Sequence, residues 1–282
     1  MRWRGERQST NIEDRRGMSA GKVAVGGGLG TVLIMILALV FGFDPQTLLQ
    51  QVPDEQPSHV QSSRPQNAEE EELKQFVSVV LAKSEDVWSD VFQKNGRQYR
   101  EPTLVLFTDQ VRSACGIAGA AVGPFYCPTD EKVYIDLAFY EELRRQFSAP
   151  GDFAQAYVVA HEVGHHVQKL LGITQRVDAL SSRMSEAEVN QLSVRVELQA
   201  DFFAGVFARY VQNQGMLEAG DVEEALRAAS AVGDDQIQRR TTGYVVPDSF
   251  THGTSEQRLR WFKRGYDTGD IRQGDTFNAT NL

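Results

Sequence analysis

The sequence has few cysteines and no surplus of positive charge, and each shortage excludes a class of protein. Two cysteines in 282 residues cannot build a disulfide-dense scaffold or a four-cysteine metal knuckle, although they can form one disulfide. With 29 Lys and Arg against 38 Asp and Glu, the net charge is -9, so general binding to nucleic acid has no electrostatic basis. The hydrophobic content of 41% and the charged content of 24% are close to the globular average, which excludes a wholly disordered chain.

Charged side chains are also absent from residues 23–43. At about 1.5 Å per residue, a helix of this length spans a hydrocarbon core of about 30 Å, so the segment is predicted to be a transmembrane helix. A cleaved signal peptide and a buried core helix are the alternatives. Residues 1–22 carry six basic and three acidic side chains. By the positive-inside rule we expect a single-pass protein of the cell membrane. Its N-terminal segment is expected in the cytoplasm and its folded domain outside the cytoplasm.

The rest of the chain divides into a tether and a folded domain. Residues 44–68 are rich in Gln, Pro and Ser and are predicted to be a disordered tether, so the domain is expected over residues 69–282. Apolar spacing predicts helices over residues 69–94, 151–171, 185–214, 219–231 and 255–264. Strands are predicted over residues 103–108 and 132–137, with antiparallel pairing. The expected fold class is α+β, mainly helical with a small β-sheet, preceded by one transmembrane helix.

The two cysteines, Cys115 and Cys127, bracket a Gly-rich stretch between the predicted strands. In an extracytoplasmic domain we expect them to form a disulfide, worth about 3 kcal/mol in the chain-entropy model. Two buried thiols or a metal pair are the alternatives, but eleven intervening residues fit no common cysteine metal spacing.

The strongest chemical signal is His161-Glu162-Val163-Gly164-His165, an H-E-x-x-H sequence inside a predicted helix. Histidines four residues apart lie about 40° apart around a helix, so the imidazoles of His161 and His165 can both reach one Zn2+. Glu162 is offset by about 100° from His161, which suits a general base for the attacking water better than a ligand. His166, offset by about 140°, is expected to pack or to make an outer contact of the site. A satisfied pair of core histidines is the alternative.

A catalytic zinc needs a third protein ligand, and we expect it to be Glu197. Glu197 lies between two apolar residues of the predicted helix 185–214, where an unpaired acid is costly to bury. Asp201, one turn later, is placed to accept a hydrogen bond from the far nitrogen of a ligating histidine. An exposed acid or a salt bridge to Arg195 or Arg209 is the alternative for Asp201. The competing third ligands, in polar surroundings where a solvated acid is the default, are Asp178, Glu186 and Glu188.

The late histidine His252 stands in Thr251-His252-Gly253-Thr254-Ser255, just before the last predicted helix. We expect it to be a catalytic residue that donates a hydrogen bond to the developing oxyanion, with a loop or cap role as the alternative. Two neutral imidazoles and one carboxylate leave a zinc site with a formal charge of +1, which favours attack of an activated water on an amide carbonyl. The predicted cofactor is one Zn2+ per chain.

Four segments, in this order, resemble those of the bacterial putative neutral zinc metallopeptidase family: ACGIAGAAVGPFYCPTDEKVYIDL, HEVGHHVQ, ELQADFFAG and THGTSEQRLRWF. The resemblance extends over about residues 70–267. It implies a zincin-like metallopeptidase domain with a gluzincin-like site, in which His161, His165 and Glu197 bind zinc and Glu162 is the catalytic acid. It also implies a membrane-anchored bacterial protein with its domain outside the cytoplasm.

The last two segments are similar also to those of membrane proteases that keep a Glu-x-x-x-Asp pair and a late histidine. This similarity implies that Asp201 supports a ligand and that His252 lies near the substrate. Gly253 follows the histidine here, in place of the proline that is common in that wider group.

The leading interpretation is a membrane-anchored zinc peptidase, with Glu162 as general base and a metalloendopeptidase activity on peptides or proteins. The substrate is expected to lie extended along the predicted strand 132–137. Two alternatives come from other classes: a non-catalytic, metal-stabilised binding module tethered to the membrane, and a zinc amidase acting on cell-wall crosslinks. No nucleic acid partner is expected.

Overall fold

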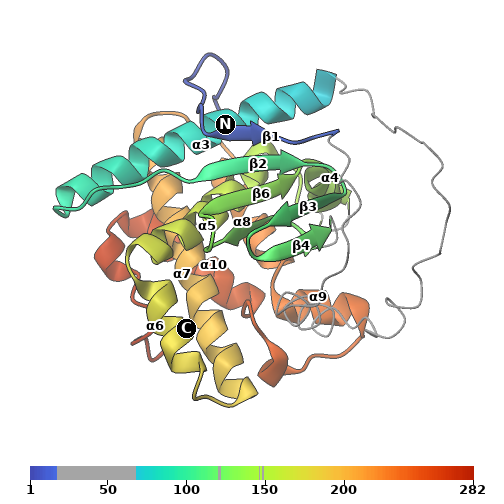
Figure 1. The fold of residues 1–282 in the computed structure, drawn as a ribbon, viewed down its shortest axis with the longest axis vertical. Coiled ribbons are helices and arrows are strands. Elements are labelled where there is room, and N and C mark those ends of the chain that lie inside the picture. The colour runs from blue at the N-terminus through green and yellow to red at the C-terminus, as the bar shows by residue number, and fades with distance from the viewer. Residues whose placement is uncertain (18–67, 120–121, 146, 148) are drawn as a thin grey trace.

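The computed structural model describes residues 1–17, 68–119, 122–145, 147 and 149–282 (Figure 1). Its strands are β1 (Ile12–Asp14), β2 (Thr103–Phe107), β3 (Gln110–Ser113), β4 (Gly116–Gly119), β5 (Phe125–Cys127) and β6 (Lys132–Asp136). Its α-helices are α3 (Ala68–Lys94), α4 (Ala138–Arg145), α5 (Asp152–Leu170), α6 (Ile173–Ser181), α7 (Glu186–Asn213), α8 (Asp221–Ala231), α9 (Asp234–Thr241) and α10 (Ser255–Thr268). Two short 3-10 helices are η2 (Pro247–Ser249) and η3 (Ile271–Gln273).

The expected fold class needs a correction. The described residues form an α+β structure with a small sheet, but none of their helices has both the length and the apolar character that a membrane crossing requires. Residues 23–43, where the transmembrane helix is predicted, lie outside the described residues, as do residues 44–67 of the predicted tether. The fold class is therefore an α+β domain with a small sheet, and the predicted transmembrane helix is not part of it.

Residues 1–17 pack onto the domain. Strand β1 pairs with β2 in parallel, and the amide of Ser9 donates a hydrogen bond to the carbonyl of Ser78 in α3 at 3.0 Å. The guanidinium of Arg16 is buried and paired with Asp14 and Glu71. Strands of one sheet lie on the same side of any bilayer. Residues 1–17 are therefore part of the same folded unit as the domain predicted over residues 69–282. The side of a membrane on which this unit lies stays a prediction.

The main sheet has the strand order β1-β2-β6-β5, in which only β5 runs against its neighbour. The antiparallel pairing predicted for residues 103–108 and 132–137 is wrong, because Thr103 lies opposite Lys132 in a parallel register. The reason is that β5 reverses the chain and forms a hairpin with β6, so β6 runs in the direction of β2. With β2 on one side and β5 on the other, β6 has no free edge. It therefore cannot hold an extended substrate as the sequence suggests.

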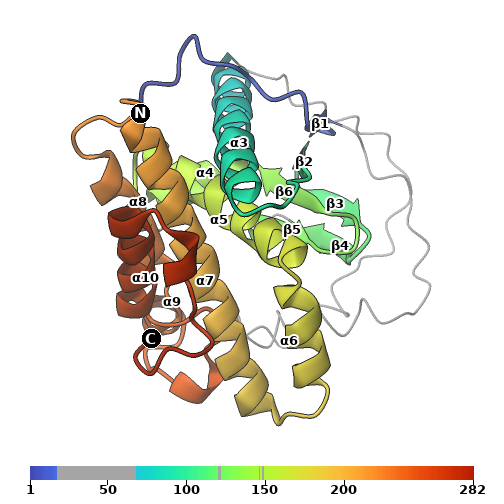
Figure 2. The same cartoon turned by 90° about the vertical axis from the view of Figure 1, so that its left-hand side faces the viewer.

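Alternate side chains of β2 and β6 enter two different apolar clusters, as the two-residue period of a strand requires. Leu104, Leu106, Val133 and Ile135 join the main core together with α3 and α5. Val105, Phe107 and Tyr134 join a smaller cluster with the β3–β4 hairpin. Figure 2 shows the sheet with α3 and α5 beside it and the hairpin at its far end.

The predicted disulfide between Cys115 and Cys127 is present. It ties the turn between β3 and β4 to the end of β5, the strand that lies against α5. Closing this short loop is worth about 3 kcal/mol in the chain-entropy model. The extracytoplasmic location that the sequence suggests stays a prediction.

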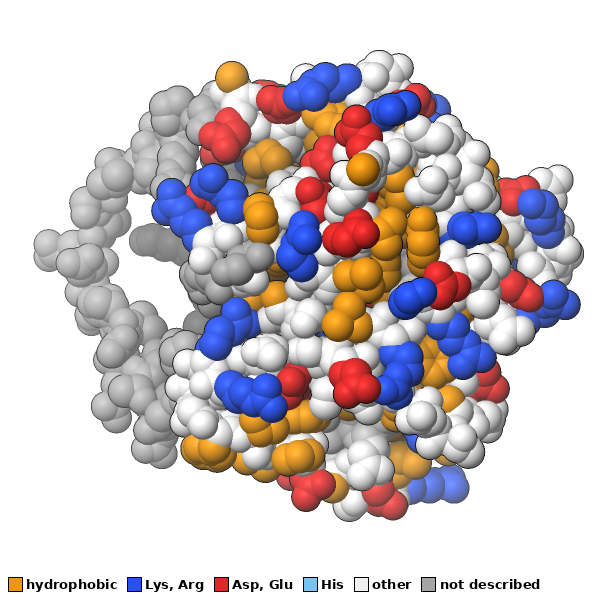
Figure 3. Space-filling model, turned by 180° about the vertical axis from the view of Figure 1, so that it is seen from behind, with side chains coloured by type: hydrophobic (Ala, Val, Ile, Leu, Met, Phe, Trp, Pro, Cys, Tyr) orange, Lys and Arg blue, Asp and Glu red, His pale blue; other side chains and the backbone are white. Residues whose placement is uncertain are grey.

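The helical half of the domain consists mainly of α5, α7, α8 and α10, which pack against one another (Figures 1 and 2). Helix α7 begins after Ser185, whose side chain and that of Glu188 form the predicted capping box. Seen from behind, the surface carries interspersed acidic and basic side chains with hydrophobic groups between them (Figure 3).

Candidate metal centre

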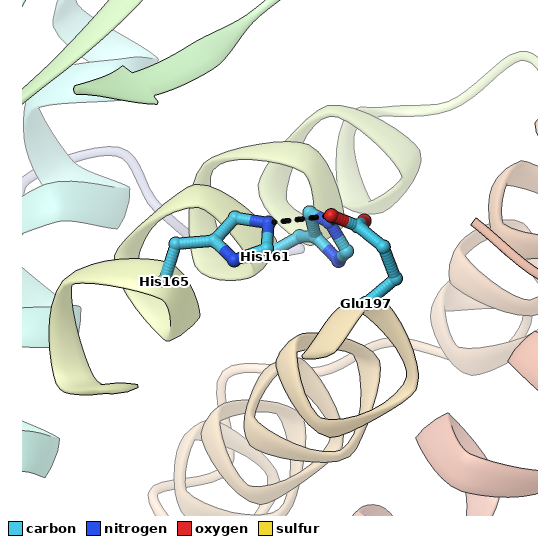
Figure 4. A group of neighbouring side chains, drawn as sticks. All are labelled: His161, His165 and Glu197. Carbon is cyan, nitrogen blue, oxygen red and sulfur yellow. Dashed lines mark hydrogen bonds and ion pairs between the residues drawn. The ribbon is translucent and has the colours of Figure 1, made fainter. Parts of the chain in front are cut away.

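Two histidines on successive turns of α5 and one glutamate of α7 converge at one point of the structure (Figure 4). One ring nitrogen of His161, one of His165 and a carboxylate oxygen of Glu197 all lie within 4.8 Å of one another. The Nε2 atom of His161 is 3.1 Å from Oε2 of Glu197, and the Nε2 atom of His165 is 3.4 Å from Oε1. Packing of α5 on α7 thus brings together groups that are distant in the sequence.

The close approach of these two helices depends on Gly164. A Cβ atom at this position would lie 3.1 Å from both the Cα and the carbonyl oxygen of Ala200 in α7. Because such contacts are tighter than ordinary packing, glycine keeps the two backbones together at the level of the site. Glu197 precedes Ala200 by about one turn, so its side chain reaches across to the imidazole rings.

The donor set fits a zinc ion. Tetrahedral zinc with bonds of about 2.0–2.1 Å holds neighbouring ligand atoms about 3.3–3.4 Å apart, close to the two nitrogen–oxygen separations seen here. Two imidazoles and a carboxylate are also the ligand set of one class of catalytic zinc site. The charges also fit a cation: Arg258 forms an ion pair with Asp201, and its charge reaches the carboxylates of Glu162 and Glu197, so three carboxylates share one buried guanidinium. A divalent cation offsets this excess of negative charge.

His161 is oriented by a buried charged network. Its Nδ1 atom lies 2.9 Å from Oδ1 of Asp201, which leaves Nε2 facing Glu197. Asp201 is fully buried and also accepts hydrogen bonds from the hydroxyl of Tyr157 at 2.5 Å and from Nε and Nη2 of Arg258 at 2.8 and 3.0 Å. The ion-pair partner of Asp201 is therefore an arginine of α10, and not Arg195 or Arg209, which the alternative interpretation of Asp201 named.

His165 is oriented by neutral amides. Its Nδ1 atom lies 2.9 Å from Oε1 of Gln168, and the amide nitrogen of Gln168 donates to the carbonyl of Val196 at 2.7 Å and to Oε1 of Gln199 at 3.1 Å. Because the carbonyl oxygen of Gln168 only accepts, Nδ1 carries a hydrogen, and Nε2 is the nitrogen that lies toward Glu197. Gln168 thereby fixes both the tautomer and the direction of the ring.

The surroundings favour positive charge at the convergence point. Burial by itself lowers the pKa of His161, but the carboxylates of Asp201 and Glu197 outweigh it and raise the pKa to about 10. Burial by itself raises the pKa of Glu197, but His165, His252 and His161 hold it well below its usual value. Both shifts have the sign expected of a preformed cation site.

Glu162 is buried beside the two rings. Its side chain follows His161 in α5 and only 8% of the residue is exposed. Burial raises its pKa, and the charges of His165 and His161 partly oppose this effect.

His252 lies in the turn before α10, near enough to Glu197 for their charges to interact. Its charge and that of Glu197 shift each other's pKa, and 35% of its side chain is exposed, against 9% for His161 and 18% for His165. It is thus the most accessible of the histidines at the site. Its Nδ1 atom lies 2.9 Å from the hydroxyl of Thr251 and 3.3 Å from Oδ1 of Asp234.

His166 points away from the other two α5 histidines into the domain. Its Nε2 donates to the carbonyl of Arg100 at 2.6 Å, and its Nδ1 accepts from the hydroxyl of Tyr126 in β5 at 2.9 Å. Both nitrogens are therefore occupied, so this ring has no lone pair for a metal.

A second group of acids, Asp152, Asp221 and Glu224, has a different partner. The α-amino group of Met1 lies 2.9 Å from Asp152 and 3.0 Å from Asp221, and Glu224 accepts a hydrogen bond from the amide of Phe153. These carboxylates are explained by the contacts that they make within the chain.

Sequence reasoning missed several groups that hold the site. Tyr157 and Gln168 lie four residues before His161 and three residues after His165, so helical periodicity alone could have placed both on the metal-facing side of α5. Arg258 lies inside the segment THGTSEQRLRWF. Asp234 carries no such local signal, because its relation to His252 arises only when α9 packs against the turn before α10.

Comparison with known proteins agrees with this geometry. A family model described as Putative neutral zinc metallopeptidase matches residues 1–277, a range that includes β1. The Escherichia coli K12 protein "Uncharacterized protein YpfJ" is 51% identical over 287 residues, which cover 99% of this chain and 100% of the relative. The Mycobacterium bovis protein "Uncharacterized protein Mb2605" is 40% identical over 262 residues, which cover 87% of this chain and 86% of the relative. No solved structure matches the chain.

Proposed function

Because this chain belongs to the putative neutral zinc metallopeptidase family, we propose that it is a zinc-dependent peptidase with His161, His165 and Glu197 as metal ligands. The observation that carries the proposal is the convergence of these three donor groups within 4.8 Å of one another, with Glu162 buried beside them. The proposed substrates are peptides or proteins.

Each catalytic step is assigned to a side chain. The three ligands would hold a zinc ion, which would supply Lewis-acid polarisation of the scissile carbonyl and an activated water. Glu162 takes a proton from the attacking water and returns it to the leaving amine, a task that suits a carboxylate with a raised pKa. His252 donates a hydrogen bond to the oxyanion that develops on the carbonyl oxygen. Asp201 and Gln168 hold the rings of His161 and His165 in the orientation that binds the metal.

The test uses the full chain, because residues 1–17 form part of the sheet. Protein stripped with a chelator is assayed on a fluorogenic peptide library before and after zinc is restored. In Glu162→Gln, which removes the base but keeps the ligands, hydrolysis should fall by about 100-fold or more while the zinc content stays at one per chain. Glu197→Ala should lose zinc. Glu186, an exposed acid in the first turn of α7, provides the matched controls. Glu186→Gln is the control for Glu162→Gln, and Glu186→Ala is the control for Glu197→Ala.

The outcomes separate the alternatives. Bound zinc without hydrolysis, in both wild type and Glu162→Gln, identifies a metal-stabilised binding module. Preference for cell-wall fragments over every peptide identifies an amidase. Full zinc retention in Glu197→Ala contradicts the ligand assignment.

A further inference from the structure

We propose that Asp234 is a positioning residue that orients His252 toward the metal centre. The inference rests on the proposed peptidase function, and it adds the residue that prepares the ring for its task. Asp234 is the first residue of α9 and is 5% exposed, so its carboxylate acts inside the fold and not on the surface.

One oxygen of Asp234 organises the backbone that carries His252. Its Oδ2 atom accepts hydrogen bonds from three consecutive amides, those of Thr251, His252 and Gly253, at 2.8, 2.6 and 2.9 Å. In return, the amide of Asp234 donates to the carbonyl of Gly253 at 2.9 Å. Three amides of the turn therefore bind one buried carboxylate, and these hydrogen bonds fix the position of the His252 backbone.

The other carboxylate oxygen of Asp234 contacts the imidazole ring of His252. Oδ1 lies 3.3 Å from Nδ1 of His252. Because a carboxylate only accepts, Nδ1 carries the hydrogen of this contact, and the hydroxyl of Thr251 lies 2.9 Å from the same nitrogen. Neither contact involves Nε2, at the opposite edge of the ring. A ring that donates from both nitrogens is an imidazolium. The charged groups that face it are Asp234 from α9, Glu197 from α7 and Arg258 from α10. Two carboxylates against one guanidinium favour that form.

The turn also explains why glycine follows the histidine. Gly253 has a φ of +90°, and a Cβ there would lie 3.1 Å from the side chains of Val194 and Gln257. Proline fixes φ near about −65°, so the His-Pro sequence of the wider group cannot adopt this turn. In this chain the hydrogen bonds from the turn to Asp234 position the backbone that carries the His252 ring.

The first experiment is a double-mutant cycle in the zinc-loaded full chain. His252→Gln is expected to lower kcat about 100- to 1,000-fold, as loss of an oxyanion donor does. Asp234→Asn keeps an oxygen for the three amides but loses the charge, and is expected to lower kcat about 10- to 100-fold with KM and zinc content unchanged. In the His252→Gln background, Asp234→Asn should have no further effect on kcat. The matched control is Asp235→Asn, because Asp235 holds Ser255 at the start of α10 and makes no hydrogen bond to His252.

Two results overturn the proposal: kcat unchanged in Asp234→Asn, or the same loss of kcat whether or not His252 is present. The second would mean that Asp234 acts on the fold alone.

The second measurement is independent of activity. The His252 ring is followed by 15N NMR as a function of pH, its signals assigned by their absence from His252→Gln. The Nε2 proton should be retained to higher pH in wild type than in Asp234→Asn. If the wild-type protein hydrolyses no peptide, the proposed function fails, and this titration still decides the role of Asp234. Identical His252 signals in the two proteins contradict it.

Discussion

Replacing Arg258 by methionine should cost the protein up to about 3–5 kcal/mol of unfolding free energy, because it removes the guanidinium partner of a buried carboxylate. Arg258 and Asp201 have side chains that are 4% and 0% exposed, and two nitrogens of the guanidinium contact the carboxylate at 2.8 and 3.0 Å. In Arg258→Met, Asp201 keeps only the hydroxyl of Tyr157 and the ring of His161. Since domains of this kind unfold with about 5–15 kcal/mol, the change is a large part of the total.

The assay is urea unfolding followed by tryptophan fluorescence, since Trp88 and Trp261 are buried in the core. It is run with a chelator and with excess zinc. Because Asp201 also orients His161, zinc affinity measured by competition with a chelating dye should fall about 10- to 100-fold. The double variant Asp201→Asn/Arg258→Met lacks the carboxylate that Arg258→Met leaves without its guanidinium, and it should recover at least about 1 kcal/mol relative to Arg258→Met alone.

The control is Arg227→Met, at an exposed arginine of α8. This variant should stay within about 0.5 kcal/mol of wild type. If Arg258→Met is equally mild and binds zinc as tightly as wild type, the network around Asp201 does not support the metal centre. If the double variant is less stable than Arg258→Met, the cost does not come from the stranded charge.

Two further substitutions test helix packing and the response to acid. Gly205→Ala places a Cβ atom 2.1 Å from the carbonyl oxygen of Phe262, so α7 and α10 must move apart, at a cost of about 1–3 kcal/mol in urea unfolding. Gly119→Ala, whose Cβ meets nothing closer than 3.7 Å, is the control, and an equal loss in both variants would refute the clash. Hydrogen bonds from Arg15 and Lys132 lower the pKa of Glu13 from 4.5 to about 2, so its contribution to stability is complete above about pH 4.5 and is lost as the pH falls toward 2. Glu13→Gln should therefore reduce the loss of unfolding free energy in acid. The reduction should be smaller than the full pKa shift implies, because the Glu13 side chain is 41% exposed. Parallel pH profiles of the two proteins would contradict this.

The helices of the domain were largely readable from the sequence. The segments predicted over residues 69–94, 151–171 and 185–214 correspond closely to α3, α5 and α7, because apolar spacing, an N-terminal cap and a terminal glycine are local signals. The short helices α4, α6 and α9 were missed, since few apolar positions repeat within them. Strand β1 was missed because its three residues pair with a strand about 90 positions away.

The pair of imidazoles one turn apart, with Glu162 beside them, could be predicted from the residues alone, because the helical period fixes the relative directions of neighbouring side chains. The sequence also identified Glu197 as an acid that needs a partner. The surroundings of these groups depend on tertiary packing: the approach of α7 at Gly164, the contact of the α10 guanidinium with Asp201, the contact of the α9 carboxylate with His252, and the direction of β6. Each of these joins residues 18 to 57 positions apart in the sequence. Such contacts depend on how whole faces of helices and strands bury their apolar side chains, which no local pattern encodes.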